Sequence, residues 1–229
     1  QHEYDLYTPG QDFLFTSKDN VFVAWKVGHP NRNMNYLRKT RLQYEREWRN
    51  GFSVKTWAQV MNNEAAGTLR YIVRNSADDF TRLQDYNTTE WGIQLRFAPG
   101  ERAYNSRLGK SSVFNLSKDA PVFRLSHQVG FRGILGGDYR YNRTEAGVSK
   151  RIWLSSFGHI DASLRGGIVW DKVPFPLLIT PNTNQSVTIQ PEAFHLMNPM
   201  EFMADRYVSF DARYHLKGWI LNRIPLINR

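Results

Sequence analysis

The stretch Trp91-Gly92-Ile93-Gln94-Leu95-Arg96-Phe97 decides the fold, because apolar side chains alternate in it with small, polar or charged ones. Successive side chains of a β-strand point to opposite faces, so the stretch predicts a strand with one apolar and one polar face. The same two-residue period runs through residues 159–168 and 207–215. The apolar residues of these three strands are Trp91, Ile93, Leu95, Phe97, Ile160, Leu164, Ile168, Val208, Phe210 and Tyr214.

The polar faces of these strands carry charges and glycines deep inside the strands, whereas the apolar faces are rich in rings. This combination is typical of a transmembrane β-barrel wall, whose outer face meets lipid and whose inner face meets a polar lumen. We therefore predict an all-β fold, an antiparallel transmembrane β-barrel. The strand residues expected to face the lumen are Gln94, Arg96, Asp161, Arg165, Asp211 and Arg213.

The composition of the 229-residue chain fits one domain, with a mean hydropathy of −0.54. No run of about 18 apolar residues exists, so no transmembrane helix is expected, and a barrel needs none because only every second residue meets lipid. The chain has no cysteine, which excludes disulfides, cysteine-ligated zinc and thiol nucleophiles. Residues 1–20 lack the basic start and apolar core of a signal peptide.

The net charge of +9 and the pI of about 9.8 raise the question of nucleic-acid binding. The basic residues are spread along the expected strands, however, and many alternate there with apolar or aromatic neighbours. A cationic lumen, or contact with anionic lipid headgroups, explains this distribution better. We therefore expect outer-membrane lipid, including lipopolysaccharide, as a partner and no nucleic acid.

About nine strands are expected, connected alternately by short turns and long irregular loops, as in outer-membrane barrels. Asn50-Gly51 is a strong hairpin signal. Residues 171–205 form a long loop rich in Pro and Asn, with a short helix around residues 199–204. Residues 1–19, 75–87 and 101–118 are expected to be irregular. The expected strands are residues 20–28, 37–48, 52–61, 89–98, 122–131, 138–154, 159–170 and 206–216, and residues 68–74 either continue the third or form another.

From Tyr141 onward the sequence resembles one family. The segments that carry the resemblance are Arg143-Thr144-Glu145-Ala146-Gly147-Val148-Ser149-Lys150-Arg151, Gly158-His159-Ile160, Gly167-Ile168-Val169-Trp170, Val173-Pro174-Phe175-Pro176-Leu177-Leu178, Phe194-His195-Leu196-Met197-Asn198, Glu201-Phe202-Met203-Ala204-Asp205-Arg206-Tyr207-Val208-Ser209 and Gly218-Trp219-Ile220-Leu221-Asn222-Arg223-Ile224-Pro225-Leu226. In this order they resemble the DUF5686 family of Bacteroidetes outer-membrane proteins, whose barrel is similar to the Omp85 (surface-antigen) superfamily. The resemblance covers residues 141–229 well and residues 1–140 in general character.

The resemblance implies further parts: a periplasmic immunoglobulin-type domain before the barrel, and more strands after residues 222–226. An incomplete sheet in lipid would leave unpaired backbone groups at its edges, each costing several kcal/mol. Bacterial single-chain barrels also have even strand numbers. We therefore expect part of a larger, Omp85-like barrel of about 16 strands, whose first and last strands here do not pair with each other.

Candidate catalytic residues give weak signals. Ser126 beside His127, and His159 near Asp161, are hydrolase residue types, but the chain has no Gly-x-Ser-x-Gly turn. His159 and Asp161 are two positions apart, so they share a strand face and are interpreted as polar wall residues. We expect no enzyme and no cofactor.

Two loop elements were candidates for binding roles. Glu192, His195, Glu201 and Asp205 could bind a divalent ion, but they lack a metal-ligand spacing, so no metal is expected. Gly130-Phe131-Arg132-Gly133 is similar to the Arg-Gly-aromatic element that Omp85 proteins hold in a lumen loop, although the residue order differs. Under that interpretation Arg132 faces the lumen and pairs with acids; the alternative is a plain glycine turn.

Three functions remain open from the sequence. The first is an outer-membrane barrel with a structural or translocation and assembly role in the cell envelope, in contact with other envelope proteins. The alternative is a porin-like or nutrient-uptake channel whose cationic lumen selects anionic solutes. The third is a soluble β-sandwich that binds glycans through surface rings, and it requires the apolar set to lie in a dry core between two sheets.

Overall fold

The computed structural model describes residues 1–11, 33–74, 79–100, 102–105, 111–114, 119–184 and 193–217. This part of the chain is all-β, and no helix in it is long and apolar enough to cross a membrane. The strands are β1 (His2–Tyr7), β2 (Asn33–Glu47), β3 (Phe52–Gly67), β4 (Tyr71–Arg74), β5 (Phe80–Leu83), β6 (Asp85–Phe97), β7 (Arg102–Asn105), β8 (Ser111–Phe114), β9 (Val122–Phe131), β10 (Tyr141–Trp153), β11 (His159–Val169) and β12 (Arg206–His215). Two single 3₁₀ turns, η2 (Ser155–Phe157) and η3 (Phe175–Leu177), accompany them.

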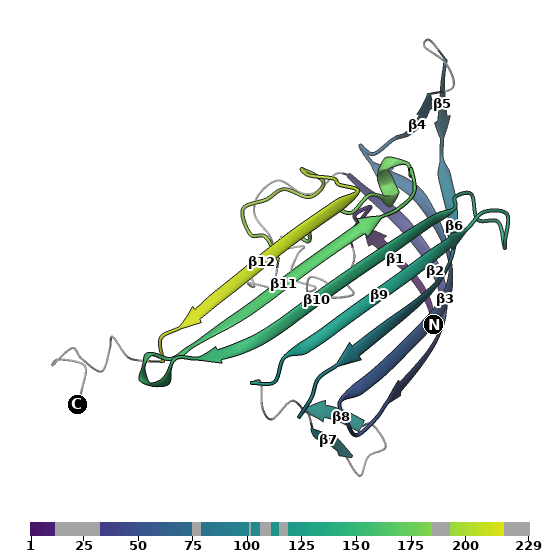
Figure 1. Cartoon of the computed structure of the whole chain (residues 1–229). Helices are drawn as coiled ribbons and strands as arrows, with labels where there is room; N and C mark the ends of the chain where they lie inside the picture. Colours follow the sequence, from purple (N-terminus) through teal and green to yellow (C-terminus); the bar gives the residue numbers. More distant parts are fainter. Residues whose placement is uncertain are drawn as a thin grey trace.

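Eight strands form one antiparallel sheet in the order β1-β2-β3-β6-β9-β10-β11-β12, so the chain winds back and forth across it (Figure 1). Strands β4 and β5 form a separate hairpin beyond one end of the sheet, and β7 and β8 form another beyond the opposite end. Within the described residues β1 and β12 are the two edges and do not pair with each other. The sheet is therefore an open, curved layer.

The main hairpins follow local sequence signals. Gly51 has φ +80° in the β2–β3 turn, where a Cβ would lie 2.0 Å from the Ala98 carbonyl oxygen, so only glycine fits. The β10–β11 turn is closed by η2 and by a bond of 2.9 Å from the Leu154 N–H to the Gly158 carbonyl. The predicted strand 122–131 is confirmed residue for residue as β9, and β6, β10, β11 and β12 agree within a few residues.

Other expectations differ from the structure. Residues 1–19 were expected to be irregular, but His2–Tyr7 is strand β1, paired with β2. The segments expected to be loops at residues 75–87 and 101–118 contain β5, the start of β6, β7 and β8. The helix expected around residues 199–204 is wrong: Met200 adopts φ +60°, and Ala204 instead forms a bridge to Ile179. The strand expected at residues 20–28 lies outside the described residues.

The strand register sorts the side chains into rows that cross the sheet. On one face, which we name the convex face, two rows are apolar from β3 to β12. The first row is Val54, Leu95, Leu125, Ala146, Gly166 and Val208; the second is Phe52, Phe97, Phe123, Val148, Leu164 and Phe210. Val208 is 82% exposed and Phe210 70% exposed. The predicted apolar set is therefore on the outside of the described structure and is not enclosed between two sheets.

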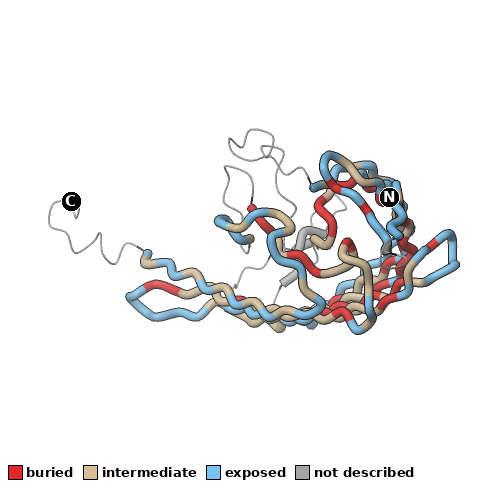
Figure 2. The backbone as a smooth tube through the Cα atoms, turned by 90° about the horizontal axis from the view of Figure 1, so that it is seen from above, coloured by how far each residue is buried: buried red, intermediate tan, exposed pale blue. Residues whose placement is uncertain are grey.

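The opposite, concave face is polar and is partly covered by the connection between β11 and β12. Figure 2 shows the sheet as a curved layer, with buried residues concentrated where it curls toward the N-terminus. The covering segment is held by a backbone bridge between Ile179 and Ala204 and by a bond of 3.0 Å from the Thr180 N–H to the Gly10 carbonyl.

A small aromatic core lies at the end of the sheet next to β4 and β5. Leu69, Tyr71 and Tyr86 are buried there, and Tyr71 meets the ring of Phe175 at 6.0 Å. Burial raises the pKa of the Tyr71 phenol far above its ordinary value. The cluster joins the β4–β5 hairpin to the β11–β12 connection.

Glycines on the concave face lie directly opposite aromatic residues of the neighbouring strand. The three pairs are Gly92 with Trp57, Gly130 with Tyr141, and Gly167 with Tyr207. Each ring lies over its glycine, because a Cβ there would come within 2.3 Å, 2.3 Å and 2.6 Å of it, respectively. Aromatic cover of this kind shields the glycine backbone and accommodates curvature.

We predict that Gly92→Ala destabilises the fold by about 1–3 kcal/mol, because the new methyl group would overlap the Trp57 ring, which is only 1% exposed. Denaturant titration in detergent checks this. Gly166→Ala on the convex face is the comparison, since its Cβ would meet nothing closer than 3.3 Å. An equal loss of stability in both variants would contradict the packing argument.

Candidate functional site

A row of arginines crosses the concave face. Arg96, Arg124 and Arg165 lie in one register row, which begins at Glu47 on β2 and ends at Ser209 on β12. Arg96 and Arg124 are directly opposite each other on β6 and β9, an arrangement that is destabilising for like charges unless other groups compensate. Each of the three arginines is engaged by another residue. Among the described strands of the sheet, these three arginines thus lie on the face opposite the apolar rows.

A buried acid lies on the same face, three register rows away from these arginines. Glu90 is 6% exposed, and it accepts hydrogen bonds from the Gln59 amide and from the Tyr141 hydroxyl. Gln59 in turn accepts a hydrogen bond of 2.7 Å from Arg41 Nε. Tyr141 reaches Glu90 across β9, and Gly130 is the residue that it crosses. The resulting chain of polar contacts links β2, β3, β6 and β10.

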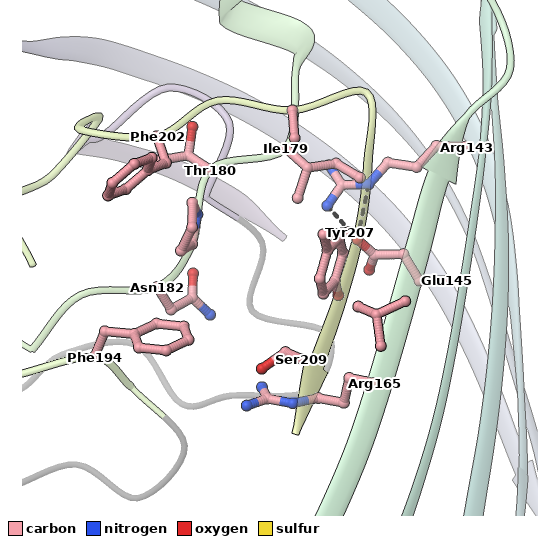
Figure 3. A pocket seen from close by; sticks show the side chains of 13 residues that line it. Arg143, Glu145, Arg165, Ile179, Thr180, Asn182, Phe194, Phe202, Tyr207 and Ser209 are labelled. Atoms are coloured by element: carbon pink, nitrogen blue, oxygen red, sulfur yellow. Dashed lines mark hydrogen bonds and ion pairs between the residues drawn. The ribbon is translucent and has the colours of Figure 1, made fainter. Parts of the chain in front are cut away.

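A cavity of about 160 Å³ lies between the β11–β12 connection and strands β10 to β12 (Figure 3). Its wall on the sheet side carries the Arg143–Glu145 ion pair and Arg165. Its other wall is mainly apolar, with Ile179, Phe194, Phe202 and Pro181. The volume is below the roughly 300 Å³ that encloses a drug-sized ligand, so the cavity suits water or a very small molecule.

A further group of polar residues lies at the other end of β11 and β12 from the cavity, next to the η2 turn. Asp161 accepts two hydrogen bonds from Arg151, at 2.6 and 2.7 Å. His159 and His215 face each other across the strands, with ring centroids 4.5 Å apart, and both approach Asp161. Arg213 lies directly opposite Asp161 on β12 and forms an ion pair with Asp211 at 3.3 Å.

The structure places the strand residues that sequence analysis expected in the lumen on the concave face: Gln94, Arg96, Asp161, Arg165, Asp211 and Arg213. Arg132 differs from the expectation, because it is exposed in a turn that follows β9. That turn is tight: Gly133 and Gly136 adopt φ +80° and +84°, and the Gly133 N–H donates to the Gly137 carbonyl at 2.7 Å. Arg132 is therefore part of a plain glycine turn and not of a loop folded onto the concave face.

The other residues that the sequence suggested for catalysis or metal binding do not form sites together in the structure. Ser126 is buried on the concave face, whereas His127 lies on the convex face and contacts the Thr144 hydroxyl at 2.9 Å, so they form no nucleophile–base pair. In the long loop, Glu201 accepts a bond of 2.9 Å from the Asn198 N–H, and Asp205 pairs with Arg206. Glu192 lies outside the described residues.

His215 is the site residue that sequence analysis missed. The period-two pattern placed it on the same face as Asp211 and Arg213, but only the β11–β12 register brings it opposite His159. Among the described residues, His159, Asp161 and His215 are the group whose potential ligand atoms lie close enough together to hold a metal ion.

Comparison with known proteins gives one match. Residues 31–229 match a family of unknown function, DUF5686, over its C-terminal domain. The chain belongs to the DUF5686 family. No curated protein and no solved structure matches it. The DUF5686 match also covers residues 31–140, which resembled the family only in general character, so β2 to β9 belong to the family domain together with β10 to β12.

We predict that Tyr141→Phe destabilises this DUF5686 chain by about 1.5–3 kcal/mol, because buried Glu90 would lose a charge-assisted hydrogen bond. Denaturant titration monitored by tryptophan fluorescence measures the loss. Tyr139→Phe is the matched control: this hydroxyl makes no hydrogen bond among the described residues. If both variants unfold at the same denaturant concentration as the wild type, the Glu90 network contributes nothing.

Proposed function

We propose that the chain forms part of the wall of an outer-membrane β-barrel, with its convex face in lipid and its concave face toward a polar lumen. The observation that carries the proposal is the exposed apolar band on the convex face. It is continuous across six strands, β3 to β12, and exposed bands of this size mark interaction or membrane surfaces.

The charge distribution of the convex face supports this proposal. The band residues are Val54, Thr56, Ala58 and Val60 on β3; Trp91, Ile93, Leu95 and Phe97 on β6; Phe123, Leu125, His127 and Val129 on β9; Thr144, Ala146 and Val148 on β10; Ala162, Leu164, Gly166 and Ile168 on β11; and Val208, Phe210 and Ala212 on β12. None of them is Asp, Glu, Lys or Arg. The convex charges of the sheet lie at the borders of the band or farther out, at Arg38, Arg46, Glu64, Asp85, Lys150 and Arg206; Lys150 and Arg206 border it directly, opposite Ala162 and Ile168. Charged side chains are expected to be kept out of the middle of the band if hydrocarbon surrounds it.

The lengths of most strands of the sheet match the length needed to cross a bilayer. Transmembrane strands need about 9–11 residues. Strands β9, β11 and β12 have 10, 11 and 10 residues, and β6 and β10 have 13 each. On β2, which is longer, the convex Arg46 lies 5.2 Å from the ring of Trp48 at the strand end, an arrangement common at headgroup level.

The open edges of the sheet bear on the size of the barrel. In lipid, the unpaired backbone groups of β1 and β12 would each cost several kcal/mol, so we propose that further strands complete the wall. A larger barrel of about 16 strands, similar to the Omp85 superfamily and located in the outer membrane of Bacteroidetes, satisfies this requirement. Its role would be structural or in translocation and assembly in the cell envelope, with lipid, lipopolysaccharide and other envelope proteins as partners, and without enzymatic activity.

We expect Leu164→Arg to reduce stability in lipid vesicles by about 2–4 kcal/mol, because it places a charge in the middle of the apolar band. Ser149→Arg is the matched control. It introduces the same side chain on the concave face, in the register row that ends at Asp211, and should cost little. Urea titration of the vesicle-bound proteins gives both values.

Vesicle flotation provides the independent test of membrane location. Wild-type protein should rise with vesicles of outer-membrane lipid after a urea wash. If it stays in the aqueous fraction, and if Leu164→Arg is as stable as wild type, the membrane proposal fails.

The second candidate function is a channel for anionic solutes, and the arginine row favours it. A lumen lined by Arg96, Arg124 and Arg165 would attract anions. We expect planar-bilayer recordings of such a channel to show anion selectivity, and Arg124→Glu to reduce it. A protein that inserts but carries no current would exclude the channel and leave the structural role.

A further inference from the structure

We propose that His159, Asp161 and His215 bind a divalent transition metal, Zn²⁺, at the turn end of β11 and β12. The inference is independent of the proposed membrane location, because it depends only on side chains of two neighbouring strands. It assigns a ligand to a part of the concave face that the arginine row, the Glu90 network and the cavity do not involve.

The geometry fits a small tetrahedral ion. His215 Nε2 lies 3.4 Å and His159 Nε2 lies 3.8 Å from Asp161 Oδ2, and the three potential ligand atoms lie within 4.8 Å of one another. Zinc bonds of about 2.0–2.1 Å in a tetrahedron separate ligand atoms by about 3.3 Å. Small movements of His215, which is about half exposed, would close the difference.

The burial of His159 and its lack of hydrogen bonds are a second, independent indication of a bound ligand. Its ring is packed between Trp153, at 4.9 Å, and His215, at 4.5 Å, and the residue is only 5% exposed. Neither ring nitrogen makes a hydrogen bond within the described residues: Nδ1 has no partner, and Nε2 is too far from Asp161. A buried imidazole without partners is costly, and a metal bound at Nε2 would remove part of that cost.

The surrounding charges allow the site but limit its affinity. Arg151 holds both oxygens of Asp161, at 2.6 and 2.7 Å, and would orient the carboxylate as outer-shell groups do in metal sites. Two other cations face the group and are engaged elsewhere. Arg213 pairs with Asp211 at 3.3 Å, and Lys217 Nζ lies 4.1 Å from the Trp153 ring centroid. Because Asp161 is the only carboxylate ligand and already accepts two hydrogen bonds from Arg151, we expect binding weaker than in closed structural zinc sites.

The ligand set selects the class of ion and its effect. Two imidazoles and one carboxylate suit zinc and related transition metals and do not suit Mg²⁺ or Ca²⁺, which prefer oxygen ligands. Three protein ligands leave a position for water. Because His159 and His215 come from adjacent strands, the ion would fasten β12 to β11 and stabilise the folded state in proportion to its occupancy.

The test is calorimetric titration of Zn²⁺ into the full chain in detergent after treatment with a chelator. Wild type should bind one Zn²⁺, and His215→Ala should weaken binding by at least about tenfold. His127→Ala, on the convex face, is the matched control and should bind as wild type does. Absence of Zn²⁺ binding to wild type, or equal affinity in His215→Ala, would overturn the proposal.

A second measurement guards against loss of fold. His215 lies near the end of the edge strand and is half exposed, so its variant should retain the β circular-dichroism spectrum of wild type. Co²⁺ should give the intense visible bands of a tetrahedral site in wild type and in His127→Ala, and weak bands in His215→Ala and Asp161→Asn. Octahedral spectra in all four proteins would show that the three side chains do not act together as ligands.

Discussion

The antiparallel register is the constraint on which the rest of the structure depends. Since side chains alternate between faces, a shift of one residue between two strands would move every apolar residue of one strand to the polar face. The observed register avoids this from β3 to β12, so that Leu95, Leu125 and Val208 share a row on one side while Arg96, Arg124 and Arg165 share a row on the other. One sheet thereby presents two surfaces of opposite chemistry, with no second sheet packed against it within the described residues.

The two surfaces are stabilised by different means. The convex rows contribute apolar area, which lowers the free energy only where water is excluded. On the concave face, specific contacts replace area: Glu90 is held by Gln59 and Tyr141, and Glu145 by Arg143. Glycines opposite rings let these contacts form close to the backbone, as where Tyr141 crosses Gly130 to reach Glu90. The concave face is therefore more sensitive to changes in shape, and the convex face to changes in polarity.

Much of the sheet could be predicted from the sequence, because the strands with a clean two-residue period needed no information from elsewhere in the chain. Strand β9 and the facing of Arg96, Asp161 and Arg213 follow from that period alone. Strand β1 was missed although Tyr4 and Leu6 alternate with Glu3 and Asp5, since the segment is short and becomes a strand through its pairing with β2. The group of His159 and His215 could not be predicted, because it depends on the offset between β11 and β12. Arg132 was a candidate for the lumen face from a four-residue similarity, with a plain glycine turn as the alternative, and the structure has the compact glycine turn.

The contact between the β11–β12 connection and the first turn of the chain has a consequence for the order of folding. The eight-stranded sheet is built from neighbouring hairpins, so each pairing closes only a limited length of chain. The bond from the Gln11 amide to the Thr183 hydroxyl joins residues 172 positions apart, and the adjacent Thr180–Gly10 bond spans a similar length. Contacts of such long range close the largest loops, so they stabilise the fold only after the intervening strands have paired. The β11–β12 connection would therefore be the last part of the described structure to assemble and the first to open. It can detach while the sheet beneath it stays intact.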